Sequence, residues 1–317
     1  MVTSELKPRA TREAYGEALL ELGKRHGNVV ALDADLSGST MSKIFAAEFP
    51  ERFFNVGVAE ANMMNMAAGF AISGKIAYAS TFAVFATGRA FDQVRQSIAQ
   101  PRLPVRVVAS HGGLTVGEDG CTHQSVEDIG LMRLLPNMKV IVPADFNQTY
   151  AAVLESYDLP GPMYIRTGRP LTPFLYEEPP ASLGKGADIL REGSDISIFA
   201  CGIMVVKALE AAEELKKRDI SAEVVNVSVL KPIDVDTVAA SLSRTGYAVT
   251  AEEHSIIGGL GDAVAEVAGE YCPVRMSRLG IKDVFGKSGK PDQLLEEFNL
   301  TAGHLAELAV HVLASGK

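Results

Sequence analysis

The sequence lacks the features that mark a membrane, nucleic-acid-binding or disulfide-stabilised protein. It has no apolar run of roughly 18 residues that could cross a bilayer, and residues 1–22 lack the apolar core of a signal peptide. Acidic residues outnumber basic ones by 39 to 30, so there is no excess of positive charge to bind nucleic acid or anionic lipid. Three widely spaced cysteines, Cys121, Cys201 and Cys272, indicate neither a disulfide framework nor a zinc site. We therefore expect a soluble, cytoplasmic protein with no nucleic-acid or membrane partner.

Short apolar runs alternate with amphipathic stretches along the chain, which is typical of an α/β fold. With 317 residues, 47% of them hydrophobic, we expect two domains, each with a mostly parallel sheet covered by helices. The expected strands of the first domain are 29–33, 76–80, 105–110, 139–142 and 163–166. Its expected helices are 11–25, 60–73 and 84–100. Thr11 is in position to cap the first of them.

A proline-rich segment separates the two expected domains. Four prolines between Arg169 and Lys185 cannot sustain a helix or a central strand. We therefore place the first domain at 1–170, an extended linker at 171–188 and the second domain at 189–317. In the second domain we expect strands at 196–200, 222–227 and 248–251 and helices at 205–217 and 235–242.

The glycine-rich segment Gly258–Gly261 precedes a further expected helix in the second domain. Such a helix start can bind phosphate through its free backbone amides. Neither a GxGxxG pattern nor a Walker lysine is present, so we interpret these glycines as structural.

Three groups of residues follow expected strands of the first domain, where open α/β sheets place their ligands. Glu60 falls in the first turn of a helix, where a carboxylate can simply complement the helix dipole. Phe82 and Phe85 are three residues apart where a strand gives way to a helix, a pairing that is also typical of a core. The segment Ser110–Gln124 combines two histidines, two acidic residues and four glycines, which favours an active-site loop over a core.

Taken together, these groups resemble the pyrimidine-binding domain of transketolases. The resemblance rests on GEDGxTHQ at Gly117–Gln124, on His111 twelve residues before His123, and on STFxxF at Ser80–Phe85. The segment Glu252–Ser255 and the glycine-rich turn after it resemble the transketolase C-terminal domain. The resemblance covers essentially the whole chain, and it implies the cofactor thiamine diphosphate.

The resemblance implies a cofactor site made of Glu60, Phe82, Phe85 and Asp35. Glu60 would hydrogen-bond the pyrimidine ring and take part in catalysis, because it matches the family's glutamate at that position. Phe82 and Phe85 would line the aminopyrimidine pocket, with Phe82 stacking on the ring. Asp35 would lie near the thiazolium. The chain departs from the family pattern at Gly88, where many transketolases carry a third aromatic residue.

The resemblance also implies a substrate site for sugar phosphates. His111 and His123 would contact the substrate near the reacting carbon, as catalytic groups that donate hydrogen bonds or exchange protons. Asp119 would bind a substrate hydroxyl. The residues that would bind the sugar phosphate are Arg12, Ser39 and Arg166.

The activity implied is transfer of a two-carbon ketol unit from a ketose phosphate to an aldose phosphate, as in the pentose phosphate pathway. We find no GDG motif with a downstream Asn to hold Mg²⁺ and the diphosphate, and we assign no metal ligands to this chain. The resemblance therefore implies an N-terminal subunit that supplies the Mg²⁺ ligands. We expect a heterotetramer of two subunits of each kind.

Three other functions stay open at this point. A 1-deoxyxylulose-5-phosphate synthase has a related THQ loop, although His111 and GEDG fit a transketolase better. A 2-oxo acid dehydrogenase beta subunit has the same two-domain plan, but it would leave Asp119, Arg12 and Arg166 without an obvious use. A non-catalytic scaffold would not need this set of residues together.

Overall fold

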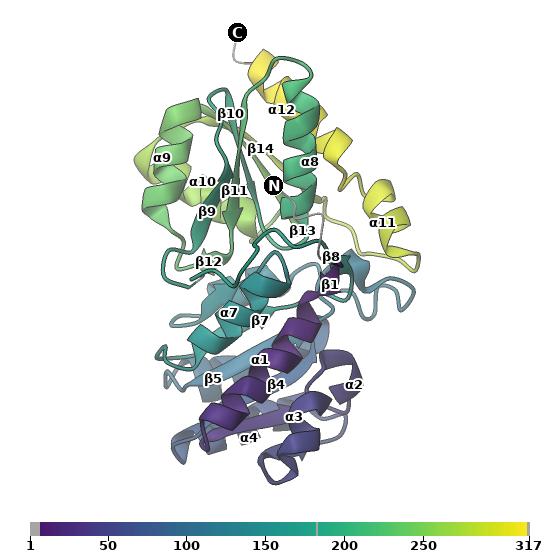
Figure 1. Cartoon of the computed structure of the whole chain (residues 1–317), viewed down its shortest axis with the longest axis vertical. Coiled ribbons are helices and arrows are strands. Elements are labelled where there is room, and N and C mark those ends of the chain that lie inside the picture. The colour runs from purple at the N-terminus through teal and green to yellow at the C-terminus, as the bar shows by residue number, and fades with distance from the viewer. Residues whose placement is uncertain (1–6, 182, 316–317) are drawn as a thin grey trace.

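The computed structural model describes residues 7–181 and 183–315, so the outer ends of the two expected domains lie outside the described residues. Two α/β bodies stand one above the other, with the N-terminal half of the chain below and the C-terminal half above (Figure 1). Each is a mostly parallel sheet covered by helices, which confirms the expected fold class.

The lower body is built on a seven-stranded sheet in the order β12-β6-β7-β5-β4-β2-β3. Its strands are β2 (Val29–Asp33), β3 (Phe53–Asn55), β4 (Ile76–Phe82), β5 (Val105–Ser110), β6 (Lys139–Ile141), β7 (Met163–Arg166) and β12 (Val229–Lys231). Neighbouring strands pair in parallel, except that β12 pairs antiparallel with β6. Because β12 follows the proline-rich segment in sequence, the second half of the chain contributes one edge of the first sheet.

Helices cover both faces of this sheet because successive strand residues are apolar on both sides. In β2, Leu32 enters a core cluster that includes α4 (Glu60–Ile72), whereas Ala31 enters a second cluster that includes α1 (Thr11–Arg25). Helix α7 (Phe146–Ser156) packs beside α1. The shorter helices of this body are α2 (Ser37–Thr40), α3 (Lys43–Glu48), α6 (Asp128–Leu134), and the 3-10 turns Pro50–Arg52 and Leu114–Val116.

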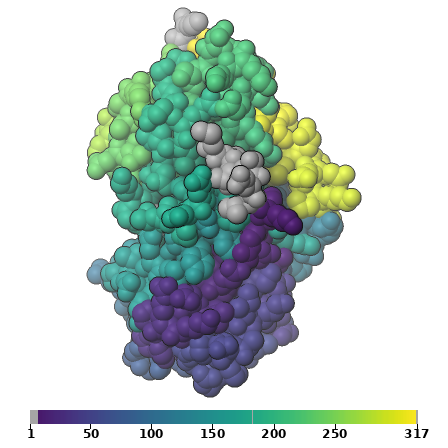
Figure 2. All heavy atoms as spheres, viewed as in Figure 1, coloured from purple at the N-terminus to yellow at the C-terminus, as the bar shows by residue number. Residues whose placement is uncertain are grey.

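The upper body has a five-stranded sheet in the order β14-β13-β10-β11-β9, with β9 antiparallel to its neighbour. Its strands are β9 (Ala187–Arg191), β10 (Ile196–Ala200), β11 (Ala222–Val227), β13 (Tyr247–Ser255) and β14 (Arg275–Ile281). Its helices are α8 (Met204–Lys216), α9 (Val235–Thr245), α10 (Leu260–Tyr271), α11 (Pro291–Glu297) and α12 (Ala302–Ala314). Helices α8 and α12 pack together, as do α9 and α10, while α11 reaches down to the turn at Leu114–Val116 (Figures 1 and 2).

Most expected elements are present, but three details differ. The helical stretch expected at 84–100 consists of π-helical turns at Phe85–Arg89 and Val94–Ala99 around the short α5 (Phe91–Gln93). Thr11 does not cap α1: Ala10 occupies that position, and Thr11 Oγ1 accepts a 2.7 Å hydrogen bond from the Gly168 amide. The proline-rich segment contains a short strand, β8 (Leu171–Thr172), which pairs with β1 (Arg9–Ala10).

A buried ion pair lies where the two bodies meet. Arg166, the last residue of β7, donates through Nε to Asp128 Oδ2 at 2.8 Å and through Nη2 to Asp128 Oδ1 at 3.2 Å. Nη2 also donates to the backbone oxygen of Glu253 in β13 at 3.0 Å. The side chains of Arg166 and Asp128 are 7% and 0% exposed. This guanidinium therefore connects β7 and α6 of the first domain to β13 of the second.

Replacing Arg166 by Met would leave Asp128 buried without its counter-ion. We expect the free energy of unfolding to fall by about 3–5 kcal/mol, measured by urea unfolding followed by circular dichroism. Arg275→Met, at the exposed start of β14, is the control and should change stability by less than about 0.5 kcal/mol. A loss below about 1 kcal/mol for Arg166→Met would contradict the role given to this ion pair.

Candidate active site

A cavity of about 360 Å³ opens beyond the carboxyl end of β2, beside the start of α4. Open α/β sheets usually bind ligands at this edge. The residues that line the cavity are Ala34, Asp35, Leu36, Val58, Glu60, Phe85, Arg89, Thr122 and His123. Four of the residues predicted from the sequence, Asp35, Glu60, Phe85 and His123, therefore share one cavity.

Glu60 is the first residue of α4, and its carboxylate is almost fully buried. Its side chain is 1% exposed, and Arg89 Nη1 lies 2.9 Å from each of its two oxygens. The Arg89 side chain is itself 51% exposed. Arg89 was not among the residues predicted from the sequence, although it directly follows Gly88, where the chain departs from the family pattern.

The two predicted aromatic residues lie differently with respect to the cavity. Phe82 is 6% exposed and stacks on His111, with ring centroids 4.0 Å apart. Phe85 lines the cavity and meets the His123 ring edge-on at 5.4 Å. Phe85, unlike Phe82, therefore lines the cavity, with the Arg89 guanidinium 4.4 Å from its ring centroid.

His111 is buried behind Phe82 and is held as a neutral imidazole. Burial, with the positive charges of Arg12 and Arg169, lowers the pKa of His111 to about 3. The Ser110 hydroxyl lies 2.9 Å from His111 Nδ1. The backbone φ of His111 is 60°, a left-handed conformation that is uncommon for a residue other than glycine and often marks a functional site.

A group of polar and charged residues lies near His111: Arg12, Ser39, Asp119 and Arg169. Arg12 Nη1 donates to the Ser39 backbone oxygen at 3.0 Å, which brings together two residues predicted to bind phosphate. Arg12 Nε is buried and has no hydrogen-bond partner among the described residues. Arg169 lies 3.6 Å from Asp119 and donates to the Val116 backbone oxygen at 2.7 Å. Burial, followed by the charge of Arg169, lowers the pKa of Arg12.

Arg166 is not part of this group. Its donors are directed to Asp128 and to backbone oxygens at the domain junction, and its side chain is buried. Arg169, three residues later and 41% exposed, is the arginine whose charge reaches both Arg12 and His111. Arg166, at the end of the strand, was predicted from the sequence to bind phosphate, whereas Arg169 in the following turn was not singled out.

The loop that contains His111 and His123 is attached to the second domain. Glu253 Oε1 accepts a 2.6 Å hydrogen bond from the Thr115 amide. Gly113 packs so closely on this carboxylate that a Cβ there would lie 2.2 Å from Glu253 Cδ, and its φ of 85° also favours glycine. At the other end of the loop, Gln124 Nε2 donates to the Lys287 backbone oxygen at 2.9 Å.

The glycine-rich turn of the second domain is filled by a side chain of the chain itself. Glu252 accepts hydrogen bonds from the amides of Leu260 at 2.7 Å and Gly261 at 2.8 Å, at the start of α10. Burial raises the pKa of Glu252 to about 7, while these two hydrogen bonds act in the opposite direction. The amides that could have bound a phosphate are occupied, which agrees with a structural role for the glycines.

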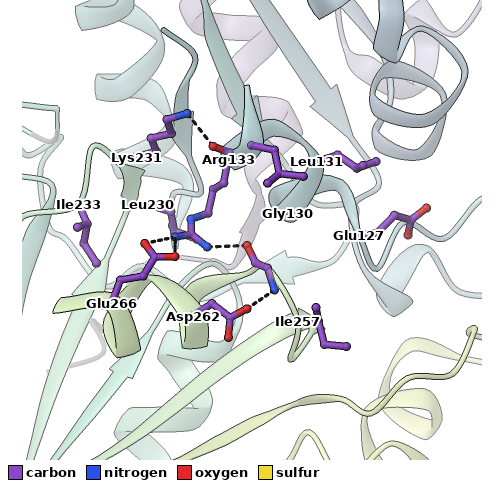
Figure 3. A pocket seen from close by; sticks show the side chains of 12 residues that line it. Glu127, Gly130, Leu131, Arg133, Leu230, Lys231, Ile233, Ile257, Asp262 and Glu266 are labelled. Atoms are coloured by element: carbon purple, nitrogen blue, oxygen red, sulfur yellow. Dashed lines mark hydrogen bonds and ion pairs between the residues drawn. The ribbon is translucent and has the colours of Figure 1, made fainter. Parts of the chain in front are cut away.

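A larger hollow, of about 590 Å³, lies at the domain junction between α6, β12 and the start of α10 (Figure 3). Its charged groups bond to neighbours: Arg133 donates to the Gly258 backbone oxygen at 2.7 Å and to Glu266 at 2.9 Å. Lys231 donates to the Arg133 backbone oxygen at 2.6 Å, as Figure 3 shows. These charges hold the junction together and do not form a reactive group.

Neither a metal-binding cluster nor a membrane-spanning helix is present in residues 7–181 and 183–315. No group of three or more His, Cys, Asp or Glu side chains there is arranged to hold a metal ion. No helix in the same part of the chain has the length and apolar character needed to span a membrane.

Comparisons with known proteins place this chain among enzymes with a pyrimidine-binding domain. The family model of the transketolase pyrimidine-binding domain matches residues 7–174. The family model of the transketolase C-terminal domain matches residues 185–305. The chain therefore belongs to the transketolase family, whose members depend on thiamine diphosphate, and corresponds to its C-terminal section. This confirms the family inferred from Gly117–Gln124 and Ser80–Phe85.

The relatives include other separate C-terminal sections. A protein of Methanocaldococcus jannaschii named as a transketolase C-terminal section is 50% identical over 303 residues, covering 94% of this chain and 95% of the relative. The 6-deoxy-6-sulfo-D-fructose transketolase subunit SqwH of Clostridium sp. strain MSTE9 is 45% identical, covering 97% and 96%. A solved structure described as a split gene transketolase, inactive beta4 tetramer, is 50% identical with a TM-score of 0.90, covering 96% and 98%.

The lowered pKa of His111 predicts that this imidazole stays neutral between about pH 5 and pH 9. Its ring ¹⁵N chemical shifts, measured by NMR and assigned by their loss in His111→Asn, should stay constant over that range. A titration midpoint above about pH 5 would show that burial and the two arginines do not control this histidine.

Proposed function

We propose that this chain is the C-terminal subunit of a two-chain transketolase, which binds the aminopyrimidine of thiamine diphosphate and transfers a two-carbon ketol unit between sugar phosphates. The observation that carries the proposal is the buried Glu60 carboxylate in a cavity shared with Phe85, Asp35 and His123. A carboxylate, an aromatic face and an opening are what an aminopyrimidine ring needs: a hydrogen-bond partner, a stacking surface and an entry path.

Each residue of the cavity has a proposed task. Glu60 hydrogen-bonds the ring nitrogen of the aminopyrimidine, and Phe85 stacks on the ring in place of the expected Phe82. Asp35 faces the thiazolium side. When bound, thiamine diphosphate supplies a carbon nucleophile and an electron sink for breaking the bond beside the ketose carbonyl.

The two histidines divide the work on the substrate. His111, which is neutral, positions a substrate oxygen by hydrogen bonding, because its lowered pKa keeps it from taking up a second proton near pH 7. His123 is half-buried at the cavity, with the Thr122 hydroxyl 2.9 Å from its Nδ1, and is the better candidate for proton exchange. Asp119 binds a substrate hydroxyl at the exposed end of the loop.

We assign the anionic end of the substrate to Arg12, Ser39 and Arg169, with Arg169 replacing Arg166. The unpaired, buried Nε of Arg12 and the half-exposed Arg169 guanidinium offer donors for a phosphate. The relative named for 6-deoxy-6-sulfo-D-fructose suggests that a sulfonate is a second group such a pair could bind. Sugar phosphates are our first choice.

We further propose that an N-terminal subunit supplies the Mg²⁺ ligands and the diphosphate contacts, in a heterotetramer of two subunits of each kind. The relatives named as a C-terminal section and as a split gene transketolase support this arrangement. The relative described as an inactive beta4 tetramer also suggests that this chain alone assembles without activity. The cytoplasmic location and the pentose phosphate pathway remain predictions from the sequence.

The direct test is reconstitution. The chain alone, with thiamine diphosphate, Mg²⁺, a ketose phosphate and an aldose phosphate, should give no ketol transfer, and adding the N-terminal subunit from the same organism should restore it. Glu60→Gln should then lower kcat by about 10²-fold or more, while Glu51→Gln, at an exposed position, should not. Turnover by the chain alone, or unchanged kcat for Glu60→Gln, would refute the proposal. Turnover of pyruvate with glyceraldehyde 3-phosphate would instead favour a deoxyxylulose-phosphate synthase.

A second test separates the two arginines. Arg169→Met should raise KM for a phosphorylated aldose by about 10-fold or more, because one charge-assisted contact to the phosphate is lost. KM for an unphosphorylated aldehyde should stay nearly the same. An equal rise for both substrates would show that Arg169 shapes the loop through Asp119 and does not bind the phosphate.

A further inference from the structure

Arg89 lies directly in front of the carboxylate that the proposed cofactor ring must reach. The geometry points to a removable cover: in the free subunit Arg89 closes off Glu60, and it leaves the carboxylate when the aminopyrimidine binds. This inference rests on the cofactor site proposed above and adds a residue that controls access to it.

The contacts of Arg89 support displacement. A single nitrogen, Nη1, bridges both Glu60 oxygens at 2.9 Å each, so the side of the carboxylate that faces the cavity is occupied. The guanidinium also lies over the Phe85 ring, 4.4 Å from its centroid. Arg89 therefore contacts both groups that are proposed to bind the ring, the Glu60 carboxylate and the face of Phe85.

The surroundings of Arg89 leave room for it to move. Its side chain is 51% exposed, so its release needs no rearrangement of a core. It ends the π-helical turn Phe85–Arg89, and π-helical turns are often found at functional sites. The preceding Gly88 is open, since a Cβ there would meet no other atom within 4 Å. The departure from the family pattern at Gly88 leaves no aromatic side chain directly before Arg89.

The free subunit needs such a partner for Glu60. A buried carboxylate without a counter-ion or hydrogen-bond donor is strongly unfavourable, and Arg89 supplies both. An aminopyrimidine could replace the hydrogen bond, and Phe85 could then stack on the ring. Because the ion pair must break first, Arg89 weakens cofactor binding relative to a subunit without it.

The test measures cofactor binding directly. Thiamine diphosphate with Mg²⁺ is titrated by calorimetry into the reconstituted two-chain complex containing wild type, Arg89→Met or Arg89→Gln. We expect Arg89→Met to bind about tenfold more tightly, and Arg89→Gln to show a smaller gain because its amide can still donate to Glu60. Arg95→Met, a change of the same kind at an exposed position on the next helical turn, should bind like wild type.

The free subunit gives an independent measurement. Arg89→Met should lower the midpoint of thermal unfolding at pH 8, because Glu60 loses its partner, and the double variant Arg89→Met with Glu60→Gln should recover most of the loss. A crystal structure of the complex with thiamine diphosphate should show the Arg89 guanidinium out of contact with Glu60.

The outcomes separate this inference from the proposed function. If wild type binds the cofactor but Arg89→Met binds equally or more weakly, or if Arg89 stays on Glu60 in the bound complex, the inference is overturned and the cofactor site stands. If no variant, wild type included, binds thiamine diphosphate in the reconstituted complex, the proposed function itself fails.

Discussion

The position of the active-site loop depends on one buried contact between the two domains. Glu253 of β13 accepts the Thr115 amide, while Arg166 donates to the Glu253 backbone oxygen and to Asp128. Gly112 and Gly113 pack directly on these two side chains, where a Cβ would lie 2.2 Å from Arg166 Nε or from Glu253 Cδ. His111 and His123 both belong to the loop Ser110–Gln124. A shift at this contact would therefore move the two proposed catalytic histidines. Among the described residues, those of the second domain do not line the 360 Å³ cavity, yet they determine where one wall of that cavity lies.

Charge in the site is controlled by burial and by arginines. His111 is neutral because it is buried near Arg12 and Arg169, and Glu60 is buried with Arg89 on both oxygens. The two situations differ in what remains available to a ligand. Arg12 Nε has no hydrogen-bond partner within the described part of the chain, which favours an anion, whereas both Glu60 oxygens are bonded to Arg89. A phosphorylated substrate would thus find a free donor at Arg12. A cofactor ring would find Glu60 already bonded to Arg89.

The sequence predicted the strands well because the apolar runs are buried on both faces of a parallel sheet. Residues 29–33, 105–110 and 163–166 form strands with the expected bounds. The resemblance to the pyrimidine-binding domain also predicted that Asp35, Glu60, Phe85 and His123 belong to one site. These residues lie in one cavity at the edge of the sheet. Of Arg166 and Arg169, only Arg166 was chosen from the sequence to bind the phosphate, and Arg169 was not considered. That choice depends on Asp128, 38 residues before Arg166, which pairs with whichever arginine the strand directs into the junction. The contact between Phe82 and His111 could not be foreseen for a similar reason, since His111 follows the next strand.

Under the two-chain proposal, this chain holds only part of a site and must be stable before its partner arrives. Strand β12 completes the first sheet from the second half of the chain, and the Arg166 contacts join the domains, so both features can form within one chain. The proposed cofactor carboxylate is different, because the aminopyrimidine proposed to bind it is not part of this chain. Arg89, which follows Gly88, forms an ion pair that compensates the buried charge of Glu60. Because the Arg89 side chain is half exposed, this contact can be released. If the two-chain proposal is correct, the Arg89–Glu60 pair is where the stability of the free subunit opposes cofactor binding by the complex.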